Sequence, residues 1–91
     1  MRFEWDAAKR RSNLRDHGFD FLDCEEIFAG ATYSFLDERF DYGEVRIITF
    51  GVLNARVVVV IHTETDEVIR VIAIRKASRN EEETYFKKIR D

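Results

Sequence analysis

The segment "ARVVVVIHTETDEVIRVIAIRKA", residues 55–77, decides the fold, because it contains two strand-like runs joined by a short turn. Residues 55–64 and 67–77 are rich in β-branched side chains, which favour strands. The connection between them is too short for a crossover helix, so the two strands are predicted to form an antiparallel hairpin.

The residues before this hairpin predict two further strands and two short helices. Residues 32–37 and 44–50 have strand-like composition and complete a sheet of four antiparallel strands. A helix is predicted from the N-cap Asp6 to about Asp16, with Gly18 as its left-handed stop.

A second helix is predicted between Asp20 and Gly30, and a short strand or extended segment at Phe3–Trp5. After the hairpin, Ser78 and Glu81 have the spacing of a capping box and open a last helix. The predicted fold class is therefore α+β, a single domain over residues 1–91 with helices largely on one face of the sheet.

Composition excludes several classes of protein. The longest apolar run, residues 57–61, is far too short to cross a bilayer, and no leader segment is apparent, so we expect a cytoplasmic protein without a membrane partner. The single cysteine, Cys24, fits a reducing compartment. One cysteine and two histidines disfavour a zinc site, and no Gly-rich phosphate loop is present, so neither a metal nor a cofactor is expected.

Charge is distributed unevenly along the chain, although the net charge is only −3. Residues 1–18 and 45–79 carry net charges of +2 and +3, whereas residues 19–44 carry −7. This pattern fits one face for phosphate and another for a basic partner. The same pattern is equally consistent with charges that have no partner and only keep a small protein soluble.

Two groups of residues are candidates for chemistry. The second hairpin strand and its exit hold four basic residues suited to phosphate, although strand arginines also cover apolar neighbours or pair with carboxylates. These are Arg70, Arg75, Lys76 and Arg79. His62 and Glu64 are an acid–base pair suited to a ribose 2′-hydroxyl, although a strand-end histidine often only bonds the neighbouring backbone.

The first helix presents Lys9, Asn13 and His17 on one face at i, i+4 and i+8. These side chains either line a groove or lock the helix to the sheet, with His17 bonding the carbonyl end of the helix. Trp5, just before the helix, is predicted to act as a hydrophobic staple rather than as a stacking platform for a base.

Four stretches in this order resemble the BrnT family of bacterial type II toxins. They are "FEWDAAKRRSNLRDHG" (3–18), "ERFDYGEVRIITFG" (38–51), "VVVVIHTE" (57–64) and "RVIAIRKASRNEEETYF" (70–86). The resemblance implies a fold similar to RelE-type ribonucleases and cleavage of RNA that arrests translation. It also implies a cognate BrnA antitoxin with a ribbon-helix-helix DNA-binding module. The toxin itself would contact operator DNA only indirectly, through this antitoxin.

The resemblance does not assign the catalytic residues, but RelE-type folds generally work from the sheet face near the last strands and the last helix. We therefore predict phosphate contacts at Arg46, Arg70, Arg75 and Arg79. The general base would be His62, with Glu64 second and His17 as a substitute, in a metal-free attack that leaves a 2′,3′-cyclic phosphate. Further RNA contacts would be Lys9, Asn13, Lys76 and Tyr85, and the acidic segment would bind the antitoxin through Asp37, Glu38 and Asp41.

Two other functions remain open at the level of sequence. One is a non-catalytic protein that uses the same fold to dock an antitoxin or a transcriptional regulator, which the negative net charge favours. The other is a metabolic enzyme with a small-molecule pocket, which the small core and the missing cofactor motifs disfavour.

Overall fold

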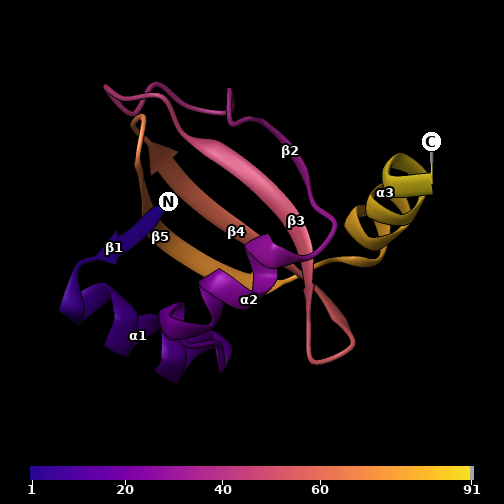
Figure 1. Ribbon diagram of the computed structural model, residues 1–91, viewed down its shortest axis with the longest axis horizontal. Helices are drawn as coiled ribbons and strands as arrows, with labels where there is room; N and C mark the ends of the chain where they lie inside the picture. The colour runs from indigo at the N-terminus through magenta and orange to yellow at the C-terminus, as the bar shows by residue number, and fades with distance from the viewer. Residues whose placement is uncertain (91) are drawn as a thin grey trace.

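The predicted hairpin forms the middle of the sheet in the computed structural model, which describes residues 1–90 (Figure 1). Strands β4 (Arg56–Glu64) and β5 (Val68–Lys76) are antiparallel, as expected. Strand β3 (Ile47–Leu53) pairs antiparallel with β4, and β2 (Tyr33–Leu36) forms one edge of the sheet. The sequence placed the start of β3 three residues too early.

The other edge of the sheet is β1 (Arg2–Trp5), which pairs in parallel with β5. The strand order is β1-β5-β4-β3-β2, so the sheet is mixed and has five strands. The α+β single-domain fold is therefore confirmed, and the Phe3–Trp5 segment is a strand of the same sheet.

The first helix, α1 (Ala7–His17), begins after the predicted N-cap Asp6 and ends one residue beyond the predicted end at about Asp16. The Asp6 carboxylate accepts hydrogen bonds from the backbone N–H groups of Ala8 and Lys9 at 2.8 and 3.1 Å. Gly18 closes the helix in the left-handed conformation, with φ 77°. Trp5 packs edge-on against Phe21 with ring centroids 6.2 Å apart, which joins it to the core, and its role as a staple for α1 stays a prediction.

The second predicted helix is divided into a 3₁₀ turn, η1 (Phe21–Asp23), and a short helix, α2 (Cys24–Ala29). Asp20 caps the turn through the N–H of Leu22, at 3.0 Å. No helix within residues 1–90 is long and apolar enough to cross a membrane.

The last helix, α3 (Arg79–Arg90), lies on the opposite face of the sheet from α1 and α2. The prediction that the helices lie largely on one face holds for α1 and α2, and α3 is the exception. The reason lies in β4, where four consecutive valines alternate between the faces, so both faces are apolar and need cover. Val58 and Val60 pack under α1 and α2, whereas Val59 packs in a second cluster with Tyr85 of α3.

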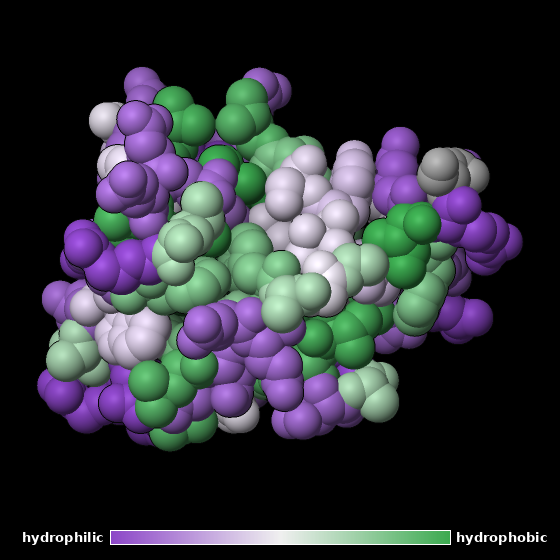
Figure 2. Space-filling model, in the orientation of Figure 1, coloured by the Kyte–Doolittle hydropathy of each residue, from purple (hydrophilic) through white to green (hydrophobic). Residues whose placement is uncertain are grey.

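The side of the molecule that faces the viewer in Figure 1 carries α1 and α2. The same side is largely hydrophilic in Figure 2, where charged and polar residues surround smaller hydrophobic patches. We call this side of the sheet the helix face and the other side, which α3 covers only in part, the open face.

Candidate functional site

The open face of the sheet is built by two cross-strand rows of side chains. Register places Tyr33, Phe50, Val59 and Arg75 in one row, and Phe35, Ile48, Ile61 and Ala73 in the next. Phe35, Ile61 and Ala73 keep some exposure to solvent, whereas the sheet residues under α1 and α2 are almost fully buried. Ile48, Phe50 and Val59 in these rows are also buried, so a ligand can reach this face at the side chains that keep some exposure, among them Phe35, Ile61, Ala73 and Arg75.

Three of the arginines that the sequence singled out share this face. Arg75 is opposite Val59, and Arg70 is opposite Thr63 and beside Glu4 of β1, which it contacts at 3.3 Å. Strand alternation extends the open face to Arg46, just before β3. Lys76 pairs with Val58 and therefore points to the helix face. The cluster predicted along β5 is thus split between two faces.

Arg75 is held by a bidentate ion pair with Glu81 of α3, at 2.7 and 2.8 Å. The guanidinium of Arg75 lowers the pKa of Glu81 to about 2, and the hydrogen bonds that Arg75 donates to Glu81 raise the pKa of Arg75. Glu81 also accepts from the N–H of Ser78, while the Ser78 hydroxyl accepts from the N–H of Glu81. The predicted capping box therefore has a second role, since it positions the partner of Arg75.

A second guanidinium, that of Arg39, lies in the loop between β2 and β3. Arg39 donates to both carboxylate oxygens of Asp37, at 2.8 and 2.9 Å. Its positive charge acts to lower the pKa of Arg75, against the larger raising effect of the hydrogen bonds to Glu81. The sequence showed Arg39 only as part of a family motif and predicted no role for it. The sequence feature that could have indicated a role for Arg39 is that it is the one basic residue in the acidic segment 19–44.

Asp37 itself is buried, and its pKa is lowered to about 2, chiefly by the hydrogen bonds from Arg39. The Tyr42 hydroxyl donates to the same carboxylate at 3.2 Å, and Arg46 stacks on the Tyr42 ring at 3.8 Å. Asp37 therefore organises the loop and has no surface for the antitoxin contact expected of it. Glu38 and Asp41 are exposed.

His62, the first candidate for the general base, is buried on the helix face and is 1% exposed. Its Nε2 lies 2.7 Å from the Thr49 hydroxyl, and its ring meets the ring of Phe28 edge-on. Nδ1 has no hydrogen-bond partner among residues 1–90. Burial lowers the pKa of His62 to about 4, so the imidazole is neutral at pH 7.

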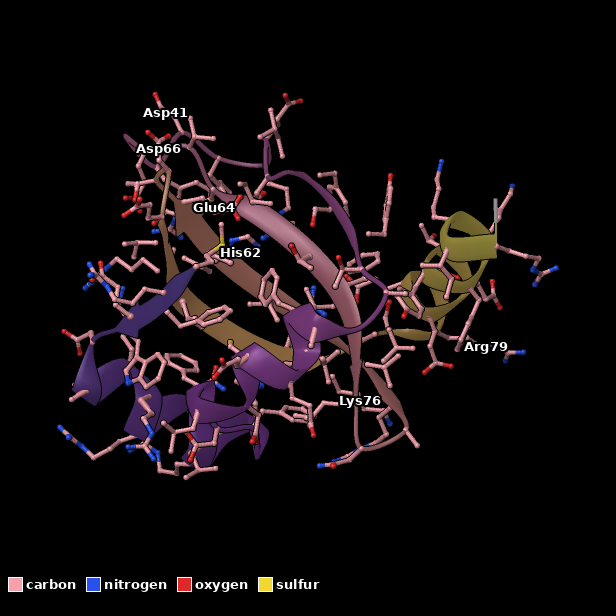
Figure 3. All side chains as sticks on the ribbon, in the orientation of Figure 1. Asp41, His62, Glu64, Asp66, Lys76 and Arg79 are labelled. Carbon is pink, nitrogen blue, oxygen red and sulfur yellow. The ribbon has the colours of Figure 1, made fainter. Side chains whose placement is uncertain are left out.

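The predicted catalytic residues do not form one cluster. His62 and Glu64 lie together at one end of the sheet in Figure 3, and Arg79 lies on α3 at the other end. Glu64 is exposed on the same face as His62, and Arg79 pairs with Glu83 at 3.5 Å. RNA bound at Arg75 would be separated from His62 by the sheet itself.

Comparison with protein families now adds to this geometry. Residues 5–81 match the family described as "Ribonuclease toxin, BrnT, of type II toxin-antitoxin system". The chain belongs to the BrnT family. It is therefore a ribonuclease toxin of a type II toxin–antitoxin system, with RNA as its substrate and a cognate antitoxin as its partner. No individual curated protein matches the chain.

In this BrnT-family chain, two residues predicted to contact RNA have structural roles. The Asn13 amide donates to the carbonyls of Phe19 and Ile74 at 3.0 and 2.9 Å, and accepts from the N–H of Ile74 at 3.0 Å. Asn13 therefore locks α1 to β5. Tyr85 is buried, and its hydroxyl donates to the Ala31 carbonyl at 2.8 Å, which ties α3 to the start of β2.

Lys9 and His17 lie on the exposed surface of α1, on the helix side of the BrnT-family sheet. They are not near the open face. Within residues 1–90, no group of three or more His, Cys, Asp or Glu side chains has the arrangement of a metal site.

One feature of the BrnT-family chain gave no signal in the sequence. A groove of about 320 Å³ lies between α3 and the open face. Its lining consists of Tyr33, Phe35, Phe50, Asn80, Glu81 and Thr84. These residues come from three elements that are distant in the chain, which is why the sequence alone did not reveal the groove.

Proposed function

We propose that this toxin is a metal-independent endoribonuclease that binds RNA on the open face of its sheet and thereby inhibits translation. The observation that carries the proposal is the placement of Arg75. Its guanidinium is fixed by Glu81 on an accessible sheet face, with Arg39 acting on it and Arg46 and Arg70 on the same face. Guanidinium groups match the geometry and charge of phosphodiesters.

In the proposed reaction, the ribose 2′-oxygen attacks the adjacent phosphorus while the bond from phosphorus to the 5′-oxygen breaks. Solvent water accepts the proton of the 2′-hydroxyl and another water protonates the leaving 5′-oxygen, so the products are a 2′,3′-cyclic phosphate and a 5′-hydroxyl. Arg75 stabilises the negative charge that accumulates on the phosphoryl oxygens, with Arg39 adding to the local positive potential.

The same geometry argues against each residue that the sequence suggested as the general base. His62 is buried, and Glu64 and His17 are not on the open face, so none of the three lies beside Arg75. Glu81 is the carboxylate at Arg75, and its pKa of about 2 makes it a weak base. We therefore assign the main catalytic contribution to charge stabilisation by arginine instead of to a tuned histidine.

The proposal includes the partner that the family resemblance implies. The toxin acts in the cytoplasm and is neutralised by an antitoxin with a ribbon-helix-helix module, through which the complex reaches operator DNA. The exposed carboxylates of Glu38 and Asp41, on the loop next to the open face, suit a basic antitoxin segment. Asp41 lies near Asp66 at the Glu64 end of the sheet in Figure 3, so an antitoxin bound there would lie nearer to Arg70, which pairs with Thr63, than to Arg75 at α3.

The test compares two adjacent basic residues that point to opposite faces. Purified wild-type protein, Arg75→Ala and Lys76→Ala are incubated with a defined messenger RNA in EDTA, and product ends are mapped. We expect cyclic phosphate ends from the wild type, a loss of roughly 100-fold in Arg75→Ala, and near wild-type cleavage by Lys76→Ala.

Thermal unfolding of each variant separates a loss of activity from a loss of fold, since Arg75→Ala also leaves Glu81 without its partner. Equal losses in folded Arg75→Ala and Lys76→Ala would refute the assignment to the open face. Wild-type RNA that stays intact in EDTA, with and without ribosomes, would refute metal-independent cleavage.

A further inference from the structure

The groove between α3 and the open face has an aromatic floor. Tyr33 and Phe35 have ring centroids 5.6 Å apart, and Phe35 meets Phe50 edge-on at 5.3 Å. Phe50 is only 3% exposed, whereas Phe35 is 36% exposed, so a buried ring supports a ring that a ligand can reach. An aromatic surface held in this way can stack on a planar ligand without losing much conformational freedom.

The opposite wall of the groove is polar. Asn80 and Thr84, one turn apart on α3, supply an amide and a hydroxyl, and Glu81 lies between them in sequence. Figure 1 shows α3 beside the β2–β3 side of the sheet, and the bond from Tyr85 to the Ala31 carbonyl holds the helix there. Apolar walls with a few placed polar groups are typical of sites for small ligands, and the volume of the groove is at the lower end of their range.

The groove is continuous with the arginine site. Glu81 lines the groove and also binds Arg75 with both carboxylate oxygens. Tyr33 and Arg75 lie in one cross-strand row but three strand spacings apart, about 14 Å between their Cα positions. Glu81 is therefore the residue that joins the groove to the arginine site. A ligand with a planar ring and a neighbouring phosphate can therefore occupy both sites at once.

We propose that this groove binds one unpaired nucleobase of the RNA, adjacent to the phosphate held by Arg75. Phe35 and Tyr33 stack on the base, and Asn80 and Thr84 contact its edge and so set a preference for particular bases. Unpaired bases in RNA are commonly bound by such stacking combined with hydrogen bonds to the base edge. The inference rests on the proposed function, since it assumes that RNA lies on the open face.

The groove favours a base over an apolar side chain of another protein because of its surroundings. Asn80 and Thr84 would lose hydrogen bonds to water under an apolar side chain, whereas the edge of a base can replace those bonds. The ammonium of Lys88 lies 5.6 Å from the centre of the Tyr33 ring, which adds positive charge beside the groove. This charge complements the sugar-phosphate chain on either side of a bound base.

The first experiment measures binding of a 2′-O-methyl oligoribonucleotide, which cannot undergo 2′-hydroxyl attack. Phe35→Ala is expected to weaken binding about tenfold or more. Its matched control is Leu36→Ala, since Leu36 is the next residue, is also exposed, and points to the helix face. Melting temperatures verify that both variants are folded.

The second experiment introduces an abasic site at each position of the oligonucleotide in turn. One position is expected to lower the affinity of the wild type about tenfold and to have no further effect on Phe35→Ala. Two surface variants, Asn80→Asp and Thr84→Val, leave the aromatic floor intact and are expected to change which base is preferred at that position.

Three results would overturn the inference in distinguishable ways. If binding depends on Arg75 but no abasic position matters, the nucleobase site is refuted and the proposed function stands. If Phe35→Ala weakens binding of the antitoxin and not of RNA, the groove is a protein-binding site. If the wild type binds no RNA, the proposed open-face site fails together with the inference.

Discussion

Asn13 illustrates how one buried side chain can connect a helix to a sheet. Its three hydrogen bonds reach two backbone carbonyls and one N–H. A side-chain amide can make all three, because its NH₂ group donates twice and its oxygen accepts. The sequence left open whether this residue lines a groove or locks α1 in place, and the structure decides for the second.

Asn13→Ala is expected to lower the free energy of unfolding by about 3 kcal/mol, because it leaves buried backbone groups of Phe19 and Ile74 without partners. Urea unfolding at pH 7 measures this loss. The control is Lys9→Ala, one helical turn earlier and exposed, which should change the free energy by less than about 0.5 kcal/mol. Similar values for the two variants would contradict the locking role.

His62 makes the stability of the protein depend on pH. Burial lowers its pKa from 6.5 to about 4, so the unfolded chain binds a proton more readily than the folded protein. The stabilisation from a neutral His62 is complete above pH 6.5 and is lost as the pH falls from 6.5 to 4, by up to about 3 kcal/mol.

His62→Gln removes the titrating group and keeps a side chain that can hydrogen-bond to Thr49. Unfolding free energies of the wild type and the variant, measured from pH 8 to pH 4.5, should converge as the pH falls. Parallel pH curves for the two proteins would show that His62 is not the source of the effect.

At the scale of elements, α2 and β3 approach closely because Gly51 has no side chain. A Cβ atom at Gly51 would lie 2.7 Å from Cγ2 of Ile27, which is fully buried in α2 and has no space to move. This contact sets how deeply α2 sits on the helix face.

Gly51→Ala is therefore expected to lower the free energy of unfolding by about 1–3 kcal/mol through overpacking. Gly30→Ala is the matched control, because the nearest atom to its Cβ is 3.8 Å away and its φ of −91° suits alanine. Urea unfolding measures both changes. Equal effects at the two glycines would mean that α2 can move away from the sheet.

At the scale of the whole molecule, charge is distributed unevenly. The open face carries arginines, whereas the segment that holds α2 and the β2–β3 loop is acidic. A protein with a net charge of −3 has weak long-range attraction for RNA, so we expect RNA affinity to depend on the few local arginines.

The loop carboxylates provide a test of the antitoxin surface. Glu38→Lys/Asp41→Lys is expected to weaken antitoxin binding at least tenfold, because both residues are exposed on the loop beside the open face. Glu25→Lys/Glu26→Lys reverses two exposed carboxylates on α2 and should leave the affinity within a factor of about three. Calorimetric titration with the cognate antitoxin measures both, and equal losses would mean that only the overall charge matters.

The sequence by itself determined the features that depend on neighbouring residues. Asp6, Gly18 and the Ser78–Glu81 capping box marked helix ends, and the β-branched runs marked the hairpin. The family resemblance, carried by short motifs in a set order, was also legible without coordinates and is confirmed over residues 5–81.

The tertiary structure alone decided which of these residues meet. Strand alternation alone separates Arg75 from Lys76, but Arg70 shares the face of Arg75 only because the register shifts between Ile61 and His62. The burial of His62 depends on Thr49 and Phe28 from other elements. The groove likewise needs α3 to cross to the face opposite α1 and α2. Local propensities act over a few residues, whereas faces and pockets are set by contacts between residues that are distant in the chain.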